Sequence, residues 1–160
     1  MFRLSTRADP TFLAEMLYEA VYWRDDGEEE RPPLDAMLAQ PDHSRFVEGW
    51  GRPGDVAVLV LDRRDEPVGA AWCRSFTSPP DGVGETIVAV YGEFRRQGVG
   101  SLLLGALLAR SAAYGAEQLR VSIDVDNPGR RFLARHGFEV DPATADGPRM
   151  TMVYEQPSGS

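Results

Sequence analysis

The sequence contains no lysine: all 17 of its basic side chains are arginine. They are outnumbered by 25 aspartates and glutamates, so the formal net charge at pH 7 is −8. A general nucleic-acid-binding protein usually presents a basic face, and this charge balance argues against one. The absence of lysine also excludes the P-loop, a nucleotide-binding motif that requires Gly-Lys-Ser or Gly-Lys-Thr.

Cysteine is nearly absent as well, and long apolar runs are missing. The single cysteine, Cys73, cannot form an internal disulfide framework, which suits a reducing cytosol. No stretch is apolar and long enough to span a bilayer, and the first residues lack the basic-then-apolar pattern of a signal peptide. We therefore expect a cytoplasmic protein that does not enter a membrane.

Metal ligands are scarce too. The two histidines, His43 and His136, are far apart and share no motif, so we expect no metal site. His136 is expected instead to cap the end of a helix.

Length and composition indicate one globular unit. The 160 residues, of which 42% are hydrophobic, are enough for a real core. We expect residues 1–156 to form a single domain and residues 157–160 to be a flexible tail. The oligomeric state stays open, with a homodimer as one alternative.

The pattern of apolar residues predicts an α/β fold. We expect strands at residues 2–6, 55–62, 67–76, 85–91, 118–125, 138–140 and 149–155. We expect helices at residues 9–23, 34–40, 98–116 and 127–137, and a helical turn at 44–50. Hairpins and crossovers both occur in this order, which predicts a mixed sheet of six to seven strands with about four helices on its faces.

The ends of these helices carry clear signals. Asp9 and Asn127 are expected N-caps because each precedes a proline at the first helical position. Gly115 is well placed to end the helix that starts near residue 98.

One segment of the acidic chain is basic. Residues 93–136 hold seven arginines against four acidic residues, a net charge of +3, whereas residues 1–92 have a net charge of −8. The basic segment opens with "EFRRQGVGSLLLGALL", in which two glycines stand between a pair of arginines and a leucine-rich helix. An anion is the natural ligand for such a segment.

Gly98 and Gly100 predict a phosphate site at the start of that helix. The first N–H groups of a helix lack internal partners and carry the positive end of its dipole, and glycine lets a phosphate approach them. Further donors follow from Arg95, Arg96, Gln97 and Ser101. The alternative is a tight turn with solvated arginines. The dinucleotide-binding pattern does not fit, because its third glycine would fall at Leu103.

At these residues the chain resembles the GNAT superfamily of acyl-CoA-dependent N-acyltransferases. Arg95, Gly98 and Gly100 match its Arg/Gln-x-x-Gly-x-Gly/Ala signature, and "DNPGRRFLARHGFE" is similar to its second motif, an Asn-led helix that ends in Gly-Phe. The resemblance covers nearly the whole chain, and the family's fold has the same order of elements.

The resemblance implies that acetyl-CoA is the acyl donor. The pyrophosphate would lie on residues 96–101, and the pantetheine and acyl carbonyl along residues 88–90, where two parallel strands separate. For Asn127 a contact to the cofactor and a plain N-cap are both open. The implied cofactor-binding residues are Val88, Ala89, Val90, Arg95, Arg96, Gln97, Gly98, Val99, Gly100, Ser101 and Asn127.

The resemblance also implies a general base at Glu85, the place of an acidic residue that many members use. The alternative is an ordinary glutamate at the end of a strand. Glu85 precedes Val90 by five residues, so the two lie on opposite faces of a regular strand unless a bulge intervenes.

The chain departs from the family pattern at two places. The usual general acid is a tyrosine at the place of Phe132 or Leu133, and neither can donate a proton. Water, Ser122 or Tyr91 could substitute, or no acid is needed. Gly92 replaces a common proline, which loosens the turn.

The acceptor site is expected around the first two helices and their connection. Its candidates are the acidic residues at 25, 26 and 28–30, together with Trp23, Trp72 and Arg74. A solvated loop and core side chains are the alternative for each. We expect an N-acetyltransferase that acts on a primary amine of a small molecule or peptide; the alternative is a degenerate acyl-CoA-binding or regulatory module without turnover.

Overall fold

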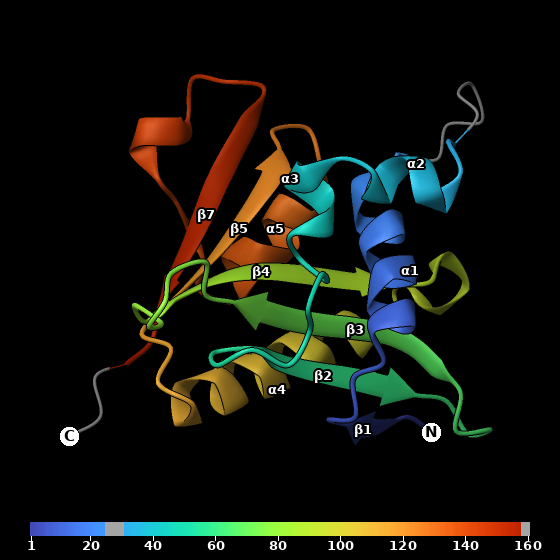
Figure 1. The fold of residues 1–160 in the computed structure, drawn as a ribbon. Coiled ribbons are helices and arrows are strands. Elements are labelled where there is room, and N and C mark those ends of the chain that lie inside the picture. Colours follow the sequence, from blue (N-terminus) through green and yellow to red (C-terminus); the bar gives the residue numbers. More distant parts are fainter. Residues whose placement is uncertain (25–30, 158–160) are drawn as a thin grey trace.

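A computed structural model of the chain describes residues 1–24 and 31–157. Seven strands form one mixed sheet in the order β1-β2-β3-β4-β5-β7-β6 (Figure 1). The strands are β1 Arg3–Ser5, β2 Val56–Leu61, β3 Pro67–Arg74, β4 Val83–Val90, β5 Gln118–Asp124, β6 Glu139–Val140 and β7 Arg149–Glu155. Among the strands of the described residues, only the neighbours β4 and β5 run parallel, which confirms the predicted mixed sheet.

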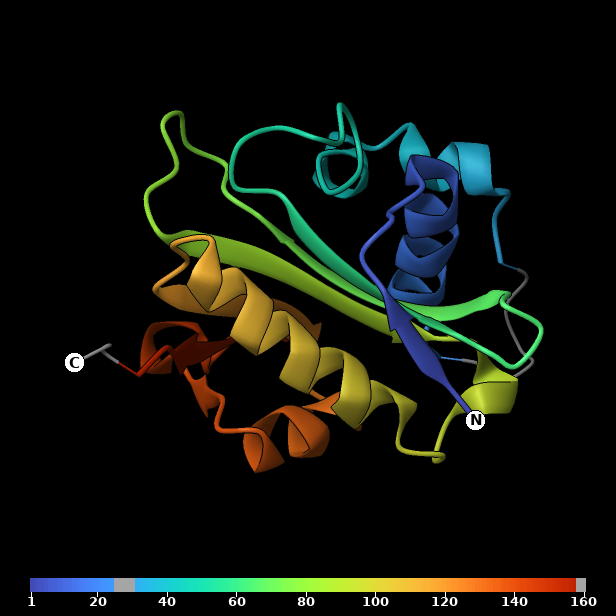
Figure 2. The same ribbon diagram turned by 90° about the horizontal axis from the view of Figure 1, so that it is seen from below.

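Helices cover both faces of this sheet (Figure 2). Three lie on one face: α1 Pro10–Val21, α2 Leu34–Leu38 and α3 Pro41–Ser44. Two lie on the opposite face: α4 Val99–Ala113 and α5 Gly129–Arg135. Two 3₁₀ turns, η1 Gly92–Phe94 and η2 Pro142–Thr144, were not expected from the sequence.

The sheet separates two hydrophobic cores, because successive side chains of a strand point to opposite faces. On β4, Val88 and Val90 pack into the core beneath α4, whereas Ile87 and Ala89 pack into the core beneath α1. The central strands β2 and β3 are buried on both faces and read as continuous apolar runs for that reason.

The predicted helix ends are largely confirmed. Asp9 Oδ1 accepts a hydrogen bond of 3.0 Å from the amide of Thr11, and Gly115 has φ +91° just after α4. The helical turn expected at 44–50 instead begins at Pro41, because the proline ring suits the first position of a helix.

The parallel pair of β4 and β5 is short. Val83–Glu85 pair with Gln118–Arg120, and beyond this point the strands diverge (Figure 1). The carboxyl-terminal half of β4 is therefore paired only with β3. This is the separation that the resemblance to acyltransferases implied.

Over the described residues, the structure holds no helix with the length and apolar character that a bilayer crossing requires.

Candidate active site

The start of α4 presents free backbone donors. Gly98 is its N-cap with φ +79°, and the first helical hydrogen bond runs from Leu102 N to Gly98 O at 3.1 Å. Among the residues that the structure describes, none accepts a hydrogen bond from the amides of Val99, Gly100 or Ser101. Arg96 also has a positive φ, +64°, so two residues of this turn have a left-handed backbone.

The two glycines of this turn serve different purposes. A Cβ at Gly98 would meet nothing within 4 Å, so there the requirement is the left-handed backbone. A Cβ at Gly100 would lie 3.3 Å from the ring of Phe132 on α5. Gly100 therefore allows α4 and α5 to approach each other. The need for glycine at this position has a structural cause besides room for a ligand.

The side chains of the turn are partly engaged. Arg95 Nε donates to the carbonyl oxygen of Val90 at 3.3 Å, and Gln97 Nε2 donates to the carbonyl oxygen of Glu93 at 3.0 Å. Arg96 is exposed and, in the described part of the chain, has no ion-pair partner. Its charge is therefore available to an anion at the helix start.

Ser101 and His136 join the two helices that flank this turn. Ser101 Oγ lies 3.0 Å from His136 Nε2, and His136 is the C-cap residue of α5, as expected. The ring of Phe132 packs edge-on against the imidazole. These contacts fix the start of α4 relative to the end of α5.

Asn127 was predicted to be the N-cap of α5, but the N-cap residue is Pro128, and Asn127 lies one position before it. The Oδ1 atom of Asn127 accepts a hydrogen bond of 2.8 Å from the amide of Gly129, and its carbonyl oxygen accepts one of 3.1 Å from Arg130. α5 begins one residue later than expected, at Gly129. A contact of Asn127 with a cofactor stays a prediction.

Beyond Glu85, one edge of β4 carries backbone groups that have no strand partner. Tyr91 N donates to Val68 O at 3.0 Å, and hydrogen-bonded residues alternate along an antiparallel pair. The backbone groups of Ala89 and Ile87 therefore point toward β3, and those of Val88 and Val90 point toward the gap beside β5. This edge can pair with an extended ligand as a further strand would.

Glu85 lies at the point where β4 and β5 separate. The β3–β4 register runs without a bulge from residue 85 to residue 90, so Glu85 and Val90 do lie on opposite faces. Glu85 shares its face with Ile87 and Ala89, on the α1 side of the sheet. In the described residues, its half-buried carboxylate has no hydrogen bond and no ion pair.

Burial makes the carboxyl group of Glu85 a weaker acid than an exposed glutamate. Desolvation raises the pKa of its carboxyl group above the ordinary value, and the nearby Asp81 adds to this effect. The positive charges of Arg120 and Arg45 act in the opposite direction but do not cancel it. A carboxylate that holds its proton more tightly than usual is a better general base near neutral pH.

The side chain at the place of the family's tyrosine, and the two residues that could substitute for it, each have other contacts in the structure. Leu133 is buried in the core beneath α4. Burial and the neighbouring Glu15 raise the pKa of Tyr91 to about 12, and its hydroxyl donates to Glu15 at 2.9 Å. Ser122 Oγ accepts a hydrogen bond of 3.3 Å from Arg149.

Two acceptor-site candidates turn out to be core residues. Trp72 is fully buried, and its indole donates to Phe46 O at 3.0 Å. Arg74 is also fully buried and forms an ion pair with Asp55 at 2.9 Å. Neither side chain can touch an acceptor. The acidic candidates between residues 25 and 30 lie outside the described residues.

Trp23 is the acceptor candidate that remains among the described residues, and its role stays a prediction. Its indole Nε1 donates to Asp124 Oδ2 at 2.9 Å, and this bond links the end of α1 to the end of β5. Arg149 on β7 donates to the other oxygen, Oδ1, at 3.0 Å. The roles of Asp124 and Arg149 were missed, because these contacts join residues 101 and 25 positions apart.

The remaining reactive groups to consider are the thiol of Cys73 and possible metal ligands. Burial raises the pKa of the Cys73 thiol to about 12, so it is a poor nucleophile. Within residues 1–24 and 31–157, no three His, Cys, Asp or Glu side chains converge where a metal ion could bind.

Solved structures share this fold. A phosphinothricin acetyltransferase from Sinorhizobium meliloti, in complex with AcCoA, has a TM-score of 0.68 and 23% identity, covering 99% of this chain and 90% of that chain. The PaiA N-acetyltransferase from Thermoplasma acidophilum, in complex with coenzyme A, has a TM-score of 0.73 and 15% identity, covering 97% of this chain and 99% of that chain. A GNAT-family acetyltransferase from Staphylococcus aureus Mu50 has a TM-score of 0.72 and 12% identity, with coverages of 98% and 100%.

Sequence comparisons point the same way. No curated protein matches the chain. The model of the acetyltransferase (GNAT) family, however, matches residues 15–138, from the middle of α1 to the end of the second motif. With the matching fold, this shows that the chain belongs to the GNAT acetyltransferase family.

Proposed function

We propose that the protein transfers an acetyl group from acetyl-CoA to a primary amine of a small molecule or peptide. Acetyl-CoA supplies an acyl group activated as a thioester. Two features of this chain fit such a donor. The amides at the start of α4 suit its pyrophosphate, and the open edge of β4 suits its extended pantetheine arm.

The protein's own residues would hold the donor at both features. The amides of Val99, Gly100 and Ser101 would bind the pyrophosphate, with the exposed guanidinium of Arg96 beside them. The arm would pair with the backbone groups of Val88 and with the N–H of Val90, whose carbonyl oxygen accepts a hydrogen bond from Arg95. The N–H of Val88 or of Val90 can donate a hydrogen bond to the carbonyl oxygen of the thioester as negative charge develops on that oxygen.

The half-buried, unpaired carboxylate of Glu85 is the single observation that carries the proposal of catalysis. At pH 7, an amine with a pKa of about 10.4 is almost entirely protonated, because the pH lies about 3.4 units below its pKa. Removing this proton adds about 4.6 kcal/mol to the barrier. A base with a raised pKa can take this proton, directly or through water. The thiolate leaving group needs no acid, since thiols have pKa values of about 8.5.

The test is thiol release from acetyl-CoA with a panel of primary amines. For a good acceptor, Glu85→Gln should lower kcat/KM by about 10²- to 10⁴-fold near neutral pH and should lose less at high pH, where free amine is abundant. The exposed Glu139→Gln is the matched control and should retain parental rates. Equal pH profiles for parent and Glu85→Gln would exclude Glu85 as the base.

The alternative function, acyl-CoA binding without turnover, is motivated by the leucine at position 133. It predicts that CoA raises the melting temperature while no amine in the panel stimulates thiol release. If any amine stimulates the release of one or more thiols per enzyme molecule, this alternative is excluded.

A further inference from the structure

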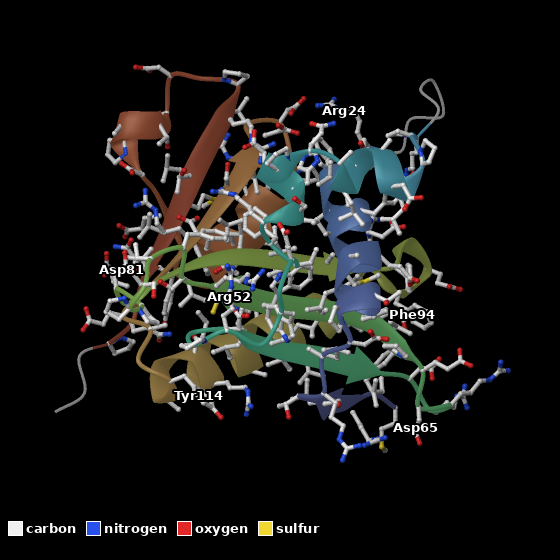
Figure 3. All side chains as sticks on the ribbon, viewed as in Figure 1. Arg24, Arg52, Asp65, Asp81, Phe94 and Tyr114 are labelled. Atoms are coloured by element: carbon white, nitrogen blue, oxygen red, sulfur yellow. The ribbon has the colours of Figure 1, made fainter. Side chains whose placement is uncertain are left out.

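A pocket of about 150 Å³ lies between α1, the start of α2 and the residue that follows β4. Its lining residues are Glu15, Tyr18, Glu19, Leu34 and Tyr91. Tyr91 packs on the same face of the sheet as Ile87, which is the face that carries Glu85. Figure 3 shows Phe94, in the 3₁₀ turn after Tyr91, at the right-hand edge of the view, where β4 ends. The pocket therefore lies at the carboxyl end of β4, on the α1 side.

Two carboxylates give the pocket negative charge. Glu15 Oε2 accepts a hydrogen bond of 2.9 Å from the hydroxyl of Tyr91, which holds this carboxylate in place. Among the described residues, Glu15 has no ion-pair partner, whereas Glu19 has a long pair with Arg31 at 3.4 Å. Burial, the hydrogen bond to Glu15 and the charges of both glutamates raise the pKa of the Tyr91 hydroxyl to about 12. A ligand in the pocket would meet the same negative field.

Two tyrosine rings form much of the remaining wall. The face of an aromatic ring attracts cations, and Tyr18 already holds one: the guanidinium Cζ of Arg31 lies 5.9 Å from its ring centroid. The hydroxyl of Tyr18 donates to the carbonyl oxygen of Pro32 at 2.7 Å, so this ring is fixed in position. Carboxylates beside aromatic faces suit an organic cation.

Other acidic side chains near the end of α1 are already paired with arginines. Asp124 pairs with Arg149 at 3.0 Å, and Asp126 pairs with Arg24 at 2.6 Å. Glu15 has no such partner in the part of the chain that the structure describes. A cation near the end of β4 would therefore find an uncompensated carboxylate in the pocket.

We propose that this pocket binds a second, non-reacting ammonium group of the acceptor, so that diamines are the preferred acceptors. The proposal rests on the proposed acetyl transfer to a primary amine. Pockets for whole ligands measure roughly 300–1,000 Å³, so this smaller one fits one end of an extended acceptor. Leu34 supplies an apolar wall for the carbon chain next to the ammonium group.

The position of the pocket fits an acceptor with two amines. The acyl carbonyl is expected along residues 88–90, and Tyr91 follows directly. A strand advances about 3.3 Å per residue, so the pocket begins within about 10 Å of Val88. An extended chain advances about 3.5 Å over three bonds, so about seven or eight bonds between the two nitrogens match this span.

The experiment compares hexamethylenediamine with hexylamine, which has the same carbon chain and a single amine, by thiol release from acetyl-CoA. The parent should have the higher kcat/KM for the diamine. Glu15→Gln keeps an acceptor oxygen for Tyr91 but removes the charge, so the preference for the diamine should fall about three- to tenfold, as a rise in its KM. Asp35→Asn, the same charge change at an exposed position of α2 outside the lining, should keep the preference.

Arg31→Gln should act in the opposite direction. It removes the cation that lies over the Tyr18 ring and pairs with Glu19, so the KM for the diamine should fall. Damage to the fold would not produce this gain. Tetramethylammonium, which cannot be acetylated, should compete for the pocket and raise the KM for the diamine more than the KM for hexylamine.

The outcomes separate this proposal from the proposed function. If Glu15→Gln and Asp35→Asn lower the preference equally, the overall acidic field causes it and the pocket proposal is wrong. Equal kcat/KM for the two amines in the parent, release with monoamines only, or a higher diamine KM in Arg31→Gln would also contradict the pocket, while acetyl transfer to amines stands. If no amine stimulates thiol release, both proposals fail.

Discussion

Gly100 and Gly105 lie five residues apart on α4 and differ in one contact. A Cβ at Gly105 would meet nothing within 4 Å, whereas one at Gly100 would lie 3.3 Å from the ring of Phe132. Gly105→Ala should therefore stabilise the protein by about 0.5–1 kcal/mol, since alanine is the better helix former. Gly100→Ala should gain less or lose stability. Urea unfolding of both variants measures the difference.

The same contact affects how the anion site can be tested. A bulky residue at Gly100 would force α4 and α5 apart, so its effect on CoA binding would not report on the glycine turn alone. The double variant Gly100→Ala/Phe132→Leu is the control. If contact with the Phe132 ring causes the loss of stability in Gly100→Ala, the smaller leucine at position 132 should remove that loss. A double variant whose loss of stability equals the sum of the two single-variant losses would contradict this explanation.

Glu85 should make stability depend on pH. Its pKa is raised in the folded state by burial, so its neutral form is favoured there, and stability is lost as pH rises through the folded pKa. Glu85→Gln should therefore raise the melting temperature at neutral pH and have little effect below about pH 4, where the carboxyl group is neutral in both states. Thermal melts from pH 4 to pH 8 provide the measurement, with Glu139→Gln as the control for net charge. A constant difference across this range would contradict the raised pKa.

At the scale of residues, the sequence predicted what local chemistry decides. The predicted cap at Asp9 follows from its neighbours and was found. Asn127 also makes a contact within two positions, to the amide of Gly129, although the N-cap residue of α5 is Pro128. The partner of Tyr91 on α1 lies 76 positions away, and no local pattern could indicate it. The missing partner of Glu85 is likewise a property of the assembled sheet.

At the scale of elements, one buried side chain holds the segment between α3 and β2 in place. Arg74 on β3 forms an ion pair with Asp55 and donates to the carbonyl oxygens of Arg45, Glu48 and Gly49. These bonds satisfy a guanidinium that is fully removed from water. Breaking such a pair leaves a buried charge without compensation.

Asp55→Ala should therefore destabilise the protein by about 3–5 kcal/mol, as expected for a buried pair. Arg3→Ala, which breaks an exposed pair with Asp65, should cost about 1 kcal/mol or less. Chemical denaturation of the two variants tests this contrast. Similar losses for both would show that burial does not decide the strength of the Arg74 contact.

The elements themselves were largely predictable, whereas their packing was not. Alternation and apolar runs predicted the strands, because β2–β5 and β7 each bury residues on one or both faces. Trp72 and Arg74 were considered for the acceptor site because a sequence does not show which face of a strand a helix covers. The structure places Trp72 beneath α1 and next to Phe46, and it places Arg74 beneath the α3–β2 segment.

At the scale of the whole molecule, charge is divided between the parts that would meet donor and acceptor. Residues 1–92 have a net charge of −8, and residues 93–136 a net charge of +3. An acidic field attracts cations, and salt screens it. Cationic amines should therefore be acetylated with higher kcat/KM than anionic amines of matched size, and the difference should narrow between low and high salt. A best acceptor that is anionic would refute this expectation.

The short pairing of β4 with β5 leads us to expect that the sheet opens as two units. One unit is β1–β4, and the other is β5–β7–β6, in which β5 and β7 pair over seven residues. Only three residues of each strand join the units within the sheet. In hydrogen–deuterium exchange, the amides of β5 and β7 should open together and before those of β2 and β3. A ligand that fills the gap would join the two units, so CoA should slow exchange on β7, a strand that it does not touch.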